Sequence, residues 1–378
     1  MNWEWPGPVI GVLGGGQLGR MLAHAGIPLG LRFRFMEAKR PCPADAVGTV
    51  VRSGYDDPGV LNTFAEGLAL ATYEFENVPV EAVEALAGSV IVRPGVEALE
   101  MAQDRLREKE GFERMGIPTN AYVPVEGREE LESALKEIGL PAVVKTRRMG
   151  YDGKGQAIIR AEEDLDEAWE AVGGVPLLVE SFVEFDRELS LVAVRSRGGA
   201  FASYPLVENV HVNGILYTTE APAANVSKSL QQKAEGMVLR LMEDLQYVGV
   251  MAVEFFQRGD ELLANEMAPR VHNSGHWTQN GAVTSQFENH LRAILALPLG
   301  ATDARGVTVM LNLLGGLPKI EEVVGEPRAH LHLYDKKPRP GRKIGHVNVV
   351  SHDAESAWEV VKKIEAGMPE SAGPPEDR

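Results

Sequence analysis

Two glutamates, Glu254 and Glu266, occupy matching positions in two neighbouring segments, residues 250–257 and 261–267, whose pattern predicts strands. The short glycine-containing segment between them predicts the turn of a β-hairpin. In such a hairpin both carboxylates can face one site. Mg²⁺ binds well to one or two carboxylates together with the phosphates of a substrate. The pair therefore points to a metal-assisted reaction of a nucleotide.

A loop rich in polar side chains follows the second of these strands. Arg270, His272 and Asn273 come directly after it, so we expect them to enter the same site. His272 and His276 have the spacing of a zinc-binding pair on a helix. The intervening Asn-Ser-Gly disfavours a helix, and the sequence offers no evident third ligand. We therefore interpret the run as a substrate loop rather than a metal site.

A glycine-rich stretch near the N-terminus, Gly14-x-Gly16-x-x-Gly19, matches the fingerprint of a dinucleotide-binding turn, and Glu37 lies near the expected acidic position. Glycines of this kind let backbone N–H groups and a helix N-terminus meet a phosphate. Any closely packed first turn of an α/β domain gives a similar pattern. The match alone therefore leaves NAD binding open.

A second glycine-rich stretch, residues 150–156, lies between two predicted strands and follows Lys145. Three glycines make a mobile loop that can approach phosphates, and the lysines supply positive charge. The pattern of a Walker loop is missing. A plain hairpin turn and a phosphate-binding loop explain the stretch equally well at this stage. Glu180 and Glu188 leave a similar choice between solvated strand ends and nucleotide contacts.

A basic run near the C-terminus, residues 336–343, holds five cations within an acidic chain. A solvated loop is the ordinary explanation of such a run. Two prolines and a glycine stiffen the segment, however, and a stiff cationic loop suits the binding of one phosphate group.

The composition limits the classes of function. The 378 residues include 38 basic and 54 acidic side chains, a net charge of −16. This balance argues against a general nucleic-acid coat and against binding to an anionic membrane. Cys42 is the only cysteine, so no intrachain disulfide and no thiolate cluster can form. The sequence shows no membrane span and no signal peptide, and we expect a cytoplasmic protein.

These motifs must be positioned by two to three domains, given the length of the chain. Strands and helices alternate over residues 9–92, which predicts a doubly wound parallel sheet. Residues 97–115 predict one long helix. We expect an N-terminal Rossmann-like domain over residues 1–104, a central domain over 105–296 and a small β-rich domain over 297–378 with a disordered tail.

Taken together, these features resemble the ATP-grasp superfamily and, more closely, the family of 5-(carboxyamino)imidazole ribonucleotide synthases. The resemblance spans nearly the whole chain, in the stretches 14–22, 73–78, 150–156, 247–254, 265–280 and 339–346. The 16-residue stretch 265–280 is the most specific. The resemblance implies an ATP-grasp fold with a pre-ATP-grasp N-terminal domain, a mobile lid in the central domain and a homodimer.

The resemblance also implies roles for individual residues. The implied ATP contacts are Arg105, Lys145, Gly150, Tyr151, Asp152, Gly153, Lys154, Gly155, Gln156, Glu180, Ser181, Phe182, Val183, Glu188, His211, Asn265 and Glu266. The implied contacts of the ribonucleotide are Gln17, Glu76, Tyr151, Lys154, Lys336 and Arg342. Asp152, Arg270, His272 and Asn273 would surround the reacting centre, and Glu254 and Glu266 would bind Mg²⁺, or Mn²⁺ in its place.

The chain departs from the family pattern at Lys154, where many relatives carry arginine. Lysine keeps the charge but loses bidentate geometry. Residues 1–8 extend beyond the usual start of the family, and we assign no function to them.

The resemblance implies that ATP, bicarbonate and 5-aminoimidazole ribonucleotide react through carboxyphosphate to give the carboxyamino product, ADP and phosphate in purine biosynthesis. A sibling reaction would use formate and glycinamide ribonucleotide, but residues 73–78 and 339–346 favour the carboxylase. A nicotinamide oxidoreductase built on residues 14–19 is a second class of function. A non-catalytic nucleotide sensor is a third, which the intact metal carboxylates and loop 270–276 disfavour.

Overall fold

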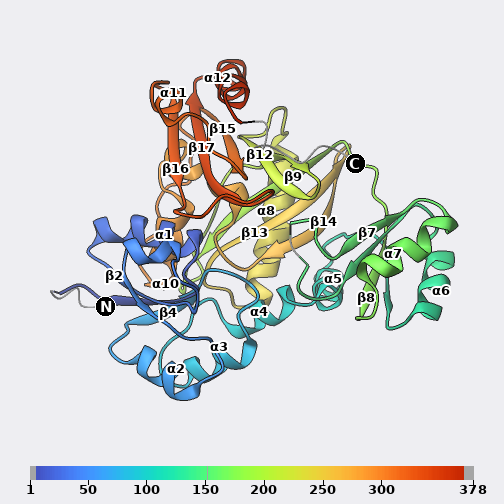
Figure 1. Ribbon diagram of the computed structural model, residues 1–378, viewed down its shortest axis with the longest axis horizontal. Coiled ribbons are helices and arrows are strands. Elements are labelled where there is room, and N and C mark those ends of the chain that lie inside the picture. The colour runs from blue at the N-terminus through green and yellow to red at the C-terminus, as the bar shows by residue number, and fades with distance from the viewer. Residues whose placement is uncertain (1–5, 151, 370–378) are drawn as a thin grey trace.

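The computed structural model describes residues 6–150 and 152–369 (Figure 1). Its N-terminal part holds a parallel four-stranded sheet in the order β3-β2-β1-β4. The strands are β1 (Val9–Leu13), β2 (Arg32–Met36), β3 (Thr49–Val51) and β4 (Leu70–Tyr73), and the first helices are α1 (Gln17–Gly26), α2 (Pro58–Ala65) and α3 (Val80–Ala87). The predicted parallel sheet is confirmed. At the end of the alternating region, Val92 forms an isolated parallel bridge with Ala71.

The long helix predicted over residues 97–115 is wrong. The chain forms α4 (Val96–Ala102) and α5 (Arg105–Arg114), and Asp104 separates them. The buried Asp104 side chain accepts a hydrogen bond from Leu106 N–H and therefore caps α5. It also pairs with Arg147, at 2.8 Å. The side chain that begins the second helix is thus also bound to a charged partner far along the chain.

A small antiparallel sheet in the order β5-β8-β6-β7 follows, with two helices packed on one of its faces. Its elements are β5 (Tyr122–Val125), α6 (Arg128–Ile138), β6 (Ala142–Thr146), β7 (Gln156–Ile159), α7 (Leu165–Val172) and β8 (Leu177–Ser181). Leu131 and Leu135 of α6 pack on Val144 and Val179 of the sheet. The opposite face of this sheet looks toward the rest of the molecule (Figure 1).

The largest element is a nine-stranded antiparallel sheet in the order β14-β13-β9-β11-β12-β15-β17-β16, with β10 beside β9. Its strands are β9 (Arg187–Arg195), β10 (Phe201–Ser203), β11 (Val207–Val212), β12 (Ile215–Ala221), β13 (Gly249–Arg258), β14 (Glu261–Ala268), β15 (Val307–Leu314), β16 (Ala329–Leu333) and β17 (Lys343–Ser351). Because β12 pairs with β15, one sheet runs through the central and C-terminal parts of the chain.

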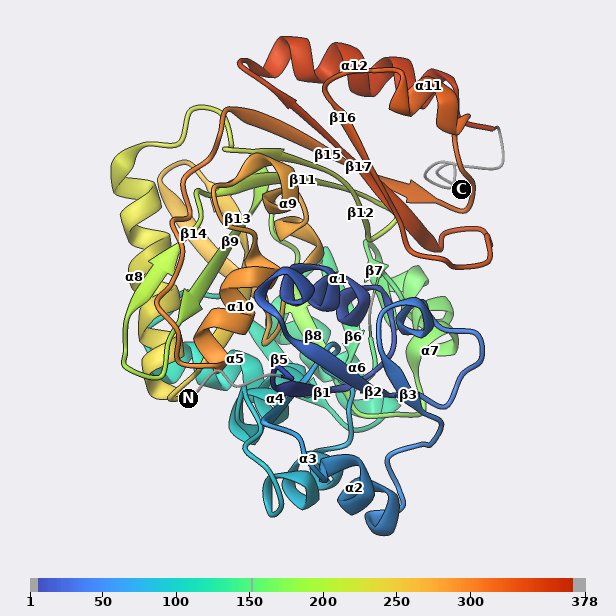
Figure 2. The ribbon, with the colours of Figure 1, turned by 90° about the vertical axis from the view of Figure 1, so that its left-hand side faces the viewer.

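Helices cover both faces of this sheet (Figure 2). They are α8 (Lys228–Asp244), α9 (Thr278–Gly281), α10 (Gln286–Ile294), α11 (Ile320–Val324) and α12 (Ala354–Ala366). Successive residues of a strand point to opposite faces. Accordingly, Leu191 of β9 packs with α8, whereas Val192 packs with α10.

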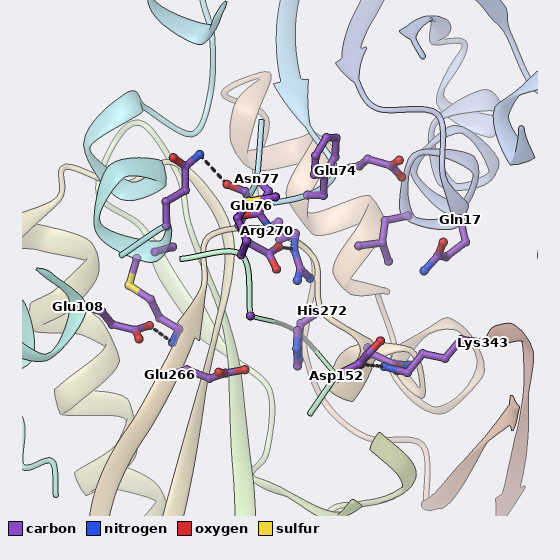
Figure 3. A pocket seen from close by; sticks show the side chains of 18 of the residues that line it. Gln17, Glu74, Glu76, Asn77, Glu108, Asp152, Glu266, Arg270, His272 and Lys343 are labelled. Atoms are coloured by element: carbon purple, nitrogen blue, oxygen red, sulfur yellow. Dashed lines mark hydrogen bonds and ion pairs between the residues drawn. The ribbon is translucent and has the colours of Figure 1, made fainter. Parts of the chain in front are cut away.

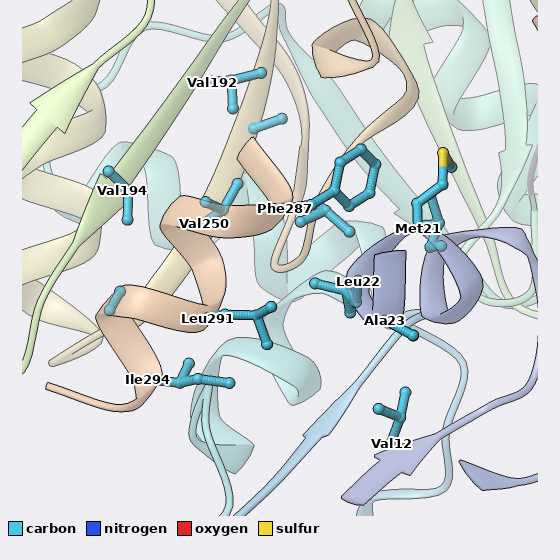
Figure 4. Packing of buried hydrophobic residues seen from close by; sticks show 14 of the residues in the cluster. Val12, Met21, Leu22, Ala23, Val192, Val194, Val250, Phe287, Leu291 and Ile294 are labelled. Carbon is cyan, nitrogen blue, oxygen red and sulfur yellow. The ribbon is translucent and has the colours of Figure 1, made fainter. Parts of the chain in front are cut away.

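Helix α10 connects the N-terminal part to the large sheet. Its residues Phe287 and Leu291 are fully buried between Leu22 of α1 and Val250 of β13 (Figure 4). On the same helix, the buried ring of His290 accepts a hydrogen bond from Val250 N–H at Nδ1 and lies 3.0 Å from Thr72 Oγ1 at Nε2. The N-terminal part, α10 and the large sheet therefore share one hydrophobic core. Within the described residues, no helix is both long and apolar enough to span a membrane.

Candidate active site

Two adjoining cavities lie where the sheets meet. The first, the sheet cleft, has a volume of about 230 Å³ and lies between the small sheet and the large one. The second, the junction cavity, has a volume of about 390 Å³ and is lined by the N-terminal part, α5 and the loop after β14. Both are lined by Arg105, Asp152, Glu266, His272, Asn273 and Lys343. A molecule in either cavity would therefore meet the same shared wall (Figure 3).

The carboxylates Glu254 and Glu266 are direct partners in the β13–β14 register, as the predicted hairpin requires. Arg105 Nη1 lies 3.1 Å from Glu266 Oε2. Burial raises the pKa of Glu254 to about 7, against the influence of His211 and with a contribution from the charge of Glu266. The pair thus brings a largely covered carboxylate, Glu254, next to the more exposed Glu266, and a cation between them would stabilise the charged form of Glu254.

The donor set of this pair fits a hard cation that also binds a ligand. Among the described residues, no three histidine, cysteine, aspartate or glutamate side chains converge on a metal position. Mg²⁺ typically binds to one or two carboxylates and completes its shell with phosphate oxygens and water. Glu254 and Glu266 therefore fit Mg²⁺ with a phosphorylated ligand, and they do not fit an all-protein metal cage.

Lys145 of β6 stands on the other side of the sheet cleft. Its Nζ lies 2.9 Å from Glu180 Oε2 and 3.4 Å from Asn265 Oδ1. Burial would raise the pKa of Glu180, but the charges of Lys145 and Lys109 outweigh it and bring the pKa to about 2. Glu180 is therefore a fixed anion that holds the ammonium group of Lys145 in place.

A histidine and a glutamate meet at the far end of the sheet cleft. His211 Nδ1 lies 2.7 Å from Glu188 Oε2. Burial alone would lower the pKa of His211. The hydrogen bond to Glu188 and the charge of Glu254 outweigh burial and raise this pKa to about 9. His211 is therefore a cation at neutral pH on a wall that also carries two carboxylates.

Arg270 and Glu76 form a partly buried ion pair in the junction cavity. Burial would raise the pKa of Glu76, but the charge and the hydrogen bond of Arg270 lower it to about 2. Asn273 exchanges two hydrogen bonds with the buried Asn312, at 3.1 and 2.9 Å. The predicted catalytic loop is therefore held from both the N-terminal part and β15.

The ring of His272 has a defined tautomer. Ser274 N–H donates to His272 Nδ1 at 3.3 Å, and Ser274 Oγ lies 2.8 Å from the same nitrogen, so we assign no proton to Nδ1 in the neutral ring. Burial and the neighbouring Arg270 lower the pKa of His272 well below its usual value. Nε2 therefore carries the proton, and it lies 3.8 Å from Glu254 Oε1. His272 is a neutral hydrogen-bond donor aimed at the shared wall.

The N-terminal glycine motif is occupied by a side chain of the protein itself. Gly16 N–H and Gly19 N–H both donate to the carboxylate of Glu74, the latter at 2.5 Å. A Cβ atom on Gly14, where φ is +106°, would lie 2.4 Å from Glu74 Cγ. The glycines are thus explained by the approach of Glu74 (Figure 3). This arrangement disfavours the interpretation of the motif as an NAD site.

The basic C-terminal run approaches the site at two points. Lys336 Nζ donates to Gln17 Oε1 and lies 6.0 Å from the centre of the Tyr334 ring. Lys343 Nζ lies 2.7 Å from Asp152 Oδ1. Arg342 Nη1 instead donates to Lys337 O at 3.0 Å. The cation of this run that lines both cavities is therefore Lys343.

Most of the predicted site residues line one cavity or both. In the sheet cleft these are Arg105, Lys145, Asp152, Gly153, Lys154, Gln156, Glu188, His211, Glu254, Asn265, Glu266, His272 and Asn273. In the junction cavity they are Gln17, Glu76, Arg105, Gly150, Asp152, Glu266, Arg270, His272 and Asn273. The linings of the two cavities do not include Gly155, Glu180, Ser181, Phe182, Val183, Lys336 and Arg342. Tyr151 lies outside the described residues.

The sequence interpretation missed three charged residues of the site, Lys343, Glu74 and Glu108. Burial, reinforced by Glu266, raises the pKa of Glu108 to about 8, and its Oε1 accepts a hydrogen bond from Met267 N–H. Lys343 could have been found, because it is the last cation of the basic run over residues 336–343. No local pattern marks Glu74 or Glu108, which act through partners more than fifty residues away.

A small antiparallel sheet that faces a larger one, with paired carboxylates between them, defines the ATP-grasp class of enzymes. The family model of the ATP-grasp domain matches residues 110–287, and that of the ribonucleotide synthetase preATP-grasp domain matches residues 8–103. The phosphoribosylaminoimidazole carboxylase C-terminal domain matches residues 308–359. The chain belongs to the N5-carboxyaminoimidazole ribonucleotide synthase family. The resemblance and the fold class expected from the sequence are confirmed.

Membership rests on relatives that match along nearly their whole length. The N5-carboxyaminoimidazole ribonucleotide synthase of Pseudomonas aeruginosa is 47% identical over 357 residues, 94% of this chain and 98% of the relative. The crystal structure of the Thermus thermophilus synthetase is 56% identical, with a TM-score of 0.91 over 95% of this chain and 98% of that one. The Aspergillus clavatus synthase, solved with ADP and 5-aminoimidazole ribonucleotide, is 30% identical, with a TM-score of 0.88 over 96% and 99%.

Proposed function

We propose that this protein uses ATP to carboxylate 5-aminoimidazole ribonucleotide with bicarbonate, and that it releases ADP and phosphate. The observation that carries the proposal is the pair of cavities with a shared wall, because a phosphoryl group activated in one can be used in the other. The relative from Aspergillus clavatus, solved with ADP and the same ribonucleotide, supports the choice of ligands.

ATP would occupy the sheet cleft. Lys145, neutralised on one side by Glu180, offers a cation to a phosphate oxygen. Val143, Ile158 and Phe256 line the cleft and give the base an apolar surface. Glu254 and Glu266 would hold Mg²⁺, or Mn²⁺ in its place, and the ion would offset the charge on the transferring phosphoryl group.

Bicarbonate would attack the γ-phosphate of ATP at the shared wall, and the bond from this phosphorus to the bridging oxygen of ADP would break. The product is carboxyphosphate. Arg270 and the Nε2–H of His272 can donate hydrogen bonds to its oxygens, since both line the junction cavity. The amine nitrogen of the ribonucleotide then bonds to the carboxyl carbon and loses a proton, and phosphate leaves.

The ribonucleotide would bind in the junction cavity, where Gln17 and Glu76 of the N-terminal part meet Asp152 and Lys343. The roles expected for Tyr151, Lys154, Lys336 and Arg342 stay predictions. The ion pair between Lys343 and Asp152 (Figure 3) would place both charges next to the acceptor. Lys343 is therefore added to the proposed substrate contacts.

Two other functions fit the site less well. The sibling reaction with formate and glycinamide ribonucleotide is disfavoured because the relatives above are all named for the carboxylating enzyme. A non-catalytic sensor would not need a carboxylate pair beside a neutral histidine donor. Assembly as a homodimer and a location in the cytoplasm stay predictions, and sedimentation of the purified protein would test the first.

The decisive experiment measures ADP release with ATP and Mg²⁺ while the other substrates are added singly and together. We expect rapid ADP release only when both bicarbonate and 5-aminoimidazole ribonucleotide are present. Faster release with formate and glycinamide ribonucleotide would establish the sibling reaction instead. A rate of ADP release that did not change with bicarbonate, formate or either ribonucleotide would contradict both the carboxylation and the sibling reaction.

A further inference from the structure

We infer that Gln286, the first residue of α10, is a positioning residue that holds His272 in its reactive orientation. The Gln286 side chain binds the backbone of His272 at both of its polar groups. Its Oε1 accepts a hydrogen bond from His272 N–H at 2.9 Å, and its Nε2 donates to His272 O at 2.6 Å. The amide is fully buried, and it lines neither of the two cavities.

A third contact completes the arrangement. Gln286 Nε2 lies 3.3 Å from Nδ1 of the buried His276, so both of its protons have acceptors. The orientation of the amide follows, because only Oε1 can accept from His272 N–H. The neighbouring Gly275 makes room for this amide, since a Cβ atom at that position would lie 2.5 Å from Gln286 Oε1. The loop passes close to the amide because it has a glycine at this point.

The backbone of Gln286 is itself held in place. Its backbone N–H donates to Thr278 Oγ1 at 3.0 Å. The next residue, Phe287, is fully buried in the core between α1 and the large sheet (Figure 4). Fixing the backbone of His272 fixes the direction of its Cα–Cβ bond, and Ser274 N–H then fixes the ring. The result is an Nε2–H group that lies 3.8 Å from Glu254 Oε1.

The chain contains a matched control one turn further along α10. Asn289 is equally buried and binds both polar groups of the Gly300 backbone, as acceptor at 2.8 Å and donor at 3.3 Å. It also donates to Tyr204 Oη at 2.9 Å. Asn289 thus makes the same three kinds of contact, but to a loop that lines neither cavity. Its loss should cost similar stability and leave the reaction centre in place.

The test compares Gln286→Leu with Asn289→Leu, and it rests on the proposed function for its kinetic part. Stability is measured by urea unfolding, and kcat and both KM values are measured from ADP release. We expect similar losses of stability, with kcat reduced about tenfold to a hundredfold only in the Gln286 variant. Gln286→Glu, which keeps the shape and the bond to His272 N–H, should recover part of kcat. A Gln286→Leu variant whose kcat stays within about twofold of that of Asn289→Leu overturns the inference.

A second readout does not depend on turnover. Nitrogen NMR of the imidazole rings, assigned with a His272→Asn variant, should show His272 as the Nε2–H tautomer in the wild type and in Asn289→Leu. In Gln286→Glu or Gln286→Leu the signal should broaden or shift toward a mixture of tautomers. If the wild type shows no ribonucleotide-dependent turnover, the proposed function fails, and this spectrum alone decides the role of Gln286. An unchanged His272 spectrum in both Gln286 variants then overturns it.

Discussion

Lys343 Nζ lies 2.7 Å from Asp152 Oδ1, and this ion pair joins the first residue of β17 to the glycine-rich loop after β6. The two residues are 191 positions apart in the chain. Both line the shared wall of the two cavities. The contact therefore brings the C-terminal strand into the place where we propose that the ribonucleotide is carboxylated.

The first prediction separates the two adjacent cations of the basic run. Lys343→Ala should lower kcat/KM for the ribonucleotide about tenfold or more, because a charge-assisted contact is worth roughly 1.5–3 kcal/mol. Arg342→Ala should raise the KM for the ribonucleotide less, since Arg342 donates to Lys337 O. The KM for ATP should change little in Arg342→Ala. A rise in the KM for ATP with an unchanged KM for the ribonucleotide would assign the loop to the other ligand.

The second prediction concerns the metal. Glu254→Gln or Glu266→Gln should nearly abolish ADP release, because Mg²⁺ would lose one of its few protein ligands. Glu254→Gln should not lower the free energy of unfolding, since burial already disfavours that charge. Glu261→Gln, on the exposed end of the same hairpin, is the control. If both site variants kept the turnover and the Mg²⁺ dependence of this control, the assignment would be wrong.

The third prediction concerns the glycine motif. Glu74→Ala should destabilise the fold by about 1–3 kcal/mol, since two buried N–H groups lose a charged acceptor. Formate, a small carboxylate, should restore part of this loss in urea unfolding. Glu37→Ala is the control, because Glu37 accepts from Lys39 N–H instead. NAD that quenched the tryptophan fluorescence of the wild type at micromolar concentration would show that the motif binds a dinucleotide after all.

The fourth prediction is a pH dependence of stability. Burial lowers the pKa of His290 from 6.5 to about 4. A group with a lowered folded pKa stabilises the fold fully above its unfolded pKa, and this stability is lost as the pH falls from 6.5 to about 4. At about 1.4 kcal/mol per pKa unit, the loss is roughly 3 kcal/mol. Urea unfolding at about pH 7 and about pH 4 should show a smaller drop for His290→Gln than for the wild type.

The control for this experiment is His352→Gln, because the His352 side chain is 86% exposed. Its unfolding free energy should follow that of the wild type at both pH values. An equal drop in the wild type, His290→Gln and His352→Gln would mean that His290 does not carry the acid sensitivity.

The sequence predicted those parts of the site that depend on local pattern. The alternation in β13 and β14 places Glu254 opposite Glu266, and the register confirms it. It did not predict that Asp104 interrupts the expected long helix, where its side chain caps α5 and also pairs with Arg147, 43 positions further on. It also could not reveal that β15 joins the sheet of β12, since strand pairing over such distances leaves no trace in either segment.

The glycine motif is a second case in which the sequence pattern alone could not decide the structure. Its pattern is identical whether a phosphate or a carboxylate of the protein meets the N–H groups, and only the fold brings Glu74 there. The roles expected for individual residues remain predictions for a related reason. The resemblance places Arg342 near the ribonucleotide, whereas in the structure the neighbouring Lys343, and not Arg342, lines the cavities.

The continuous large sheet has a consequence for how the products leave. It carries Glu266 on β14 and Lys343 on β17 within one hydrogen-bonded framework, whereas Lys145 stands on the separate small sheet. A movement that parted the two sheets would widen the sheet cleft and would keep the spacing of the groups on the large sheet. The spent nucleotide can then depart without dismantling the junction cavity. The Asp152–Lys343 ion pair is one of the contacts that such a movement would break, and because the pair is partly exposed, water would weaken it.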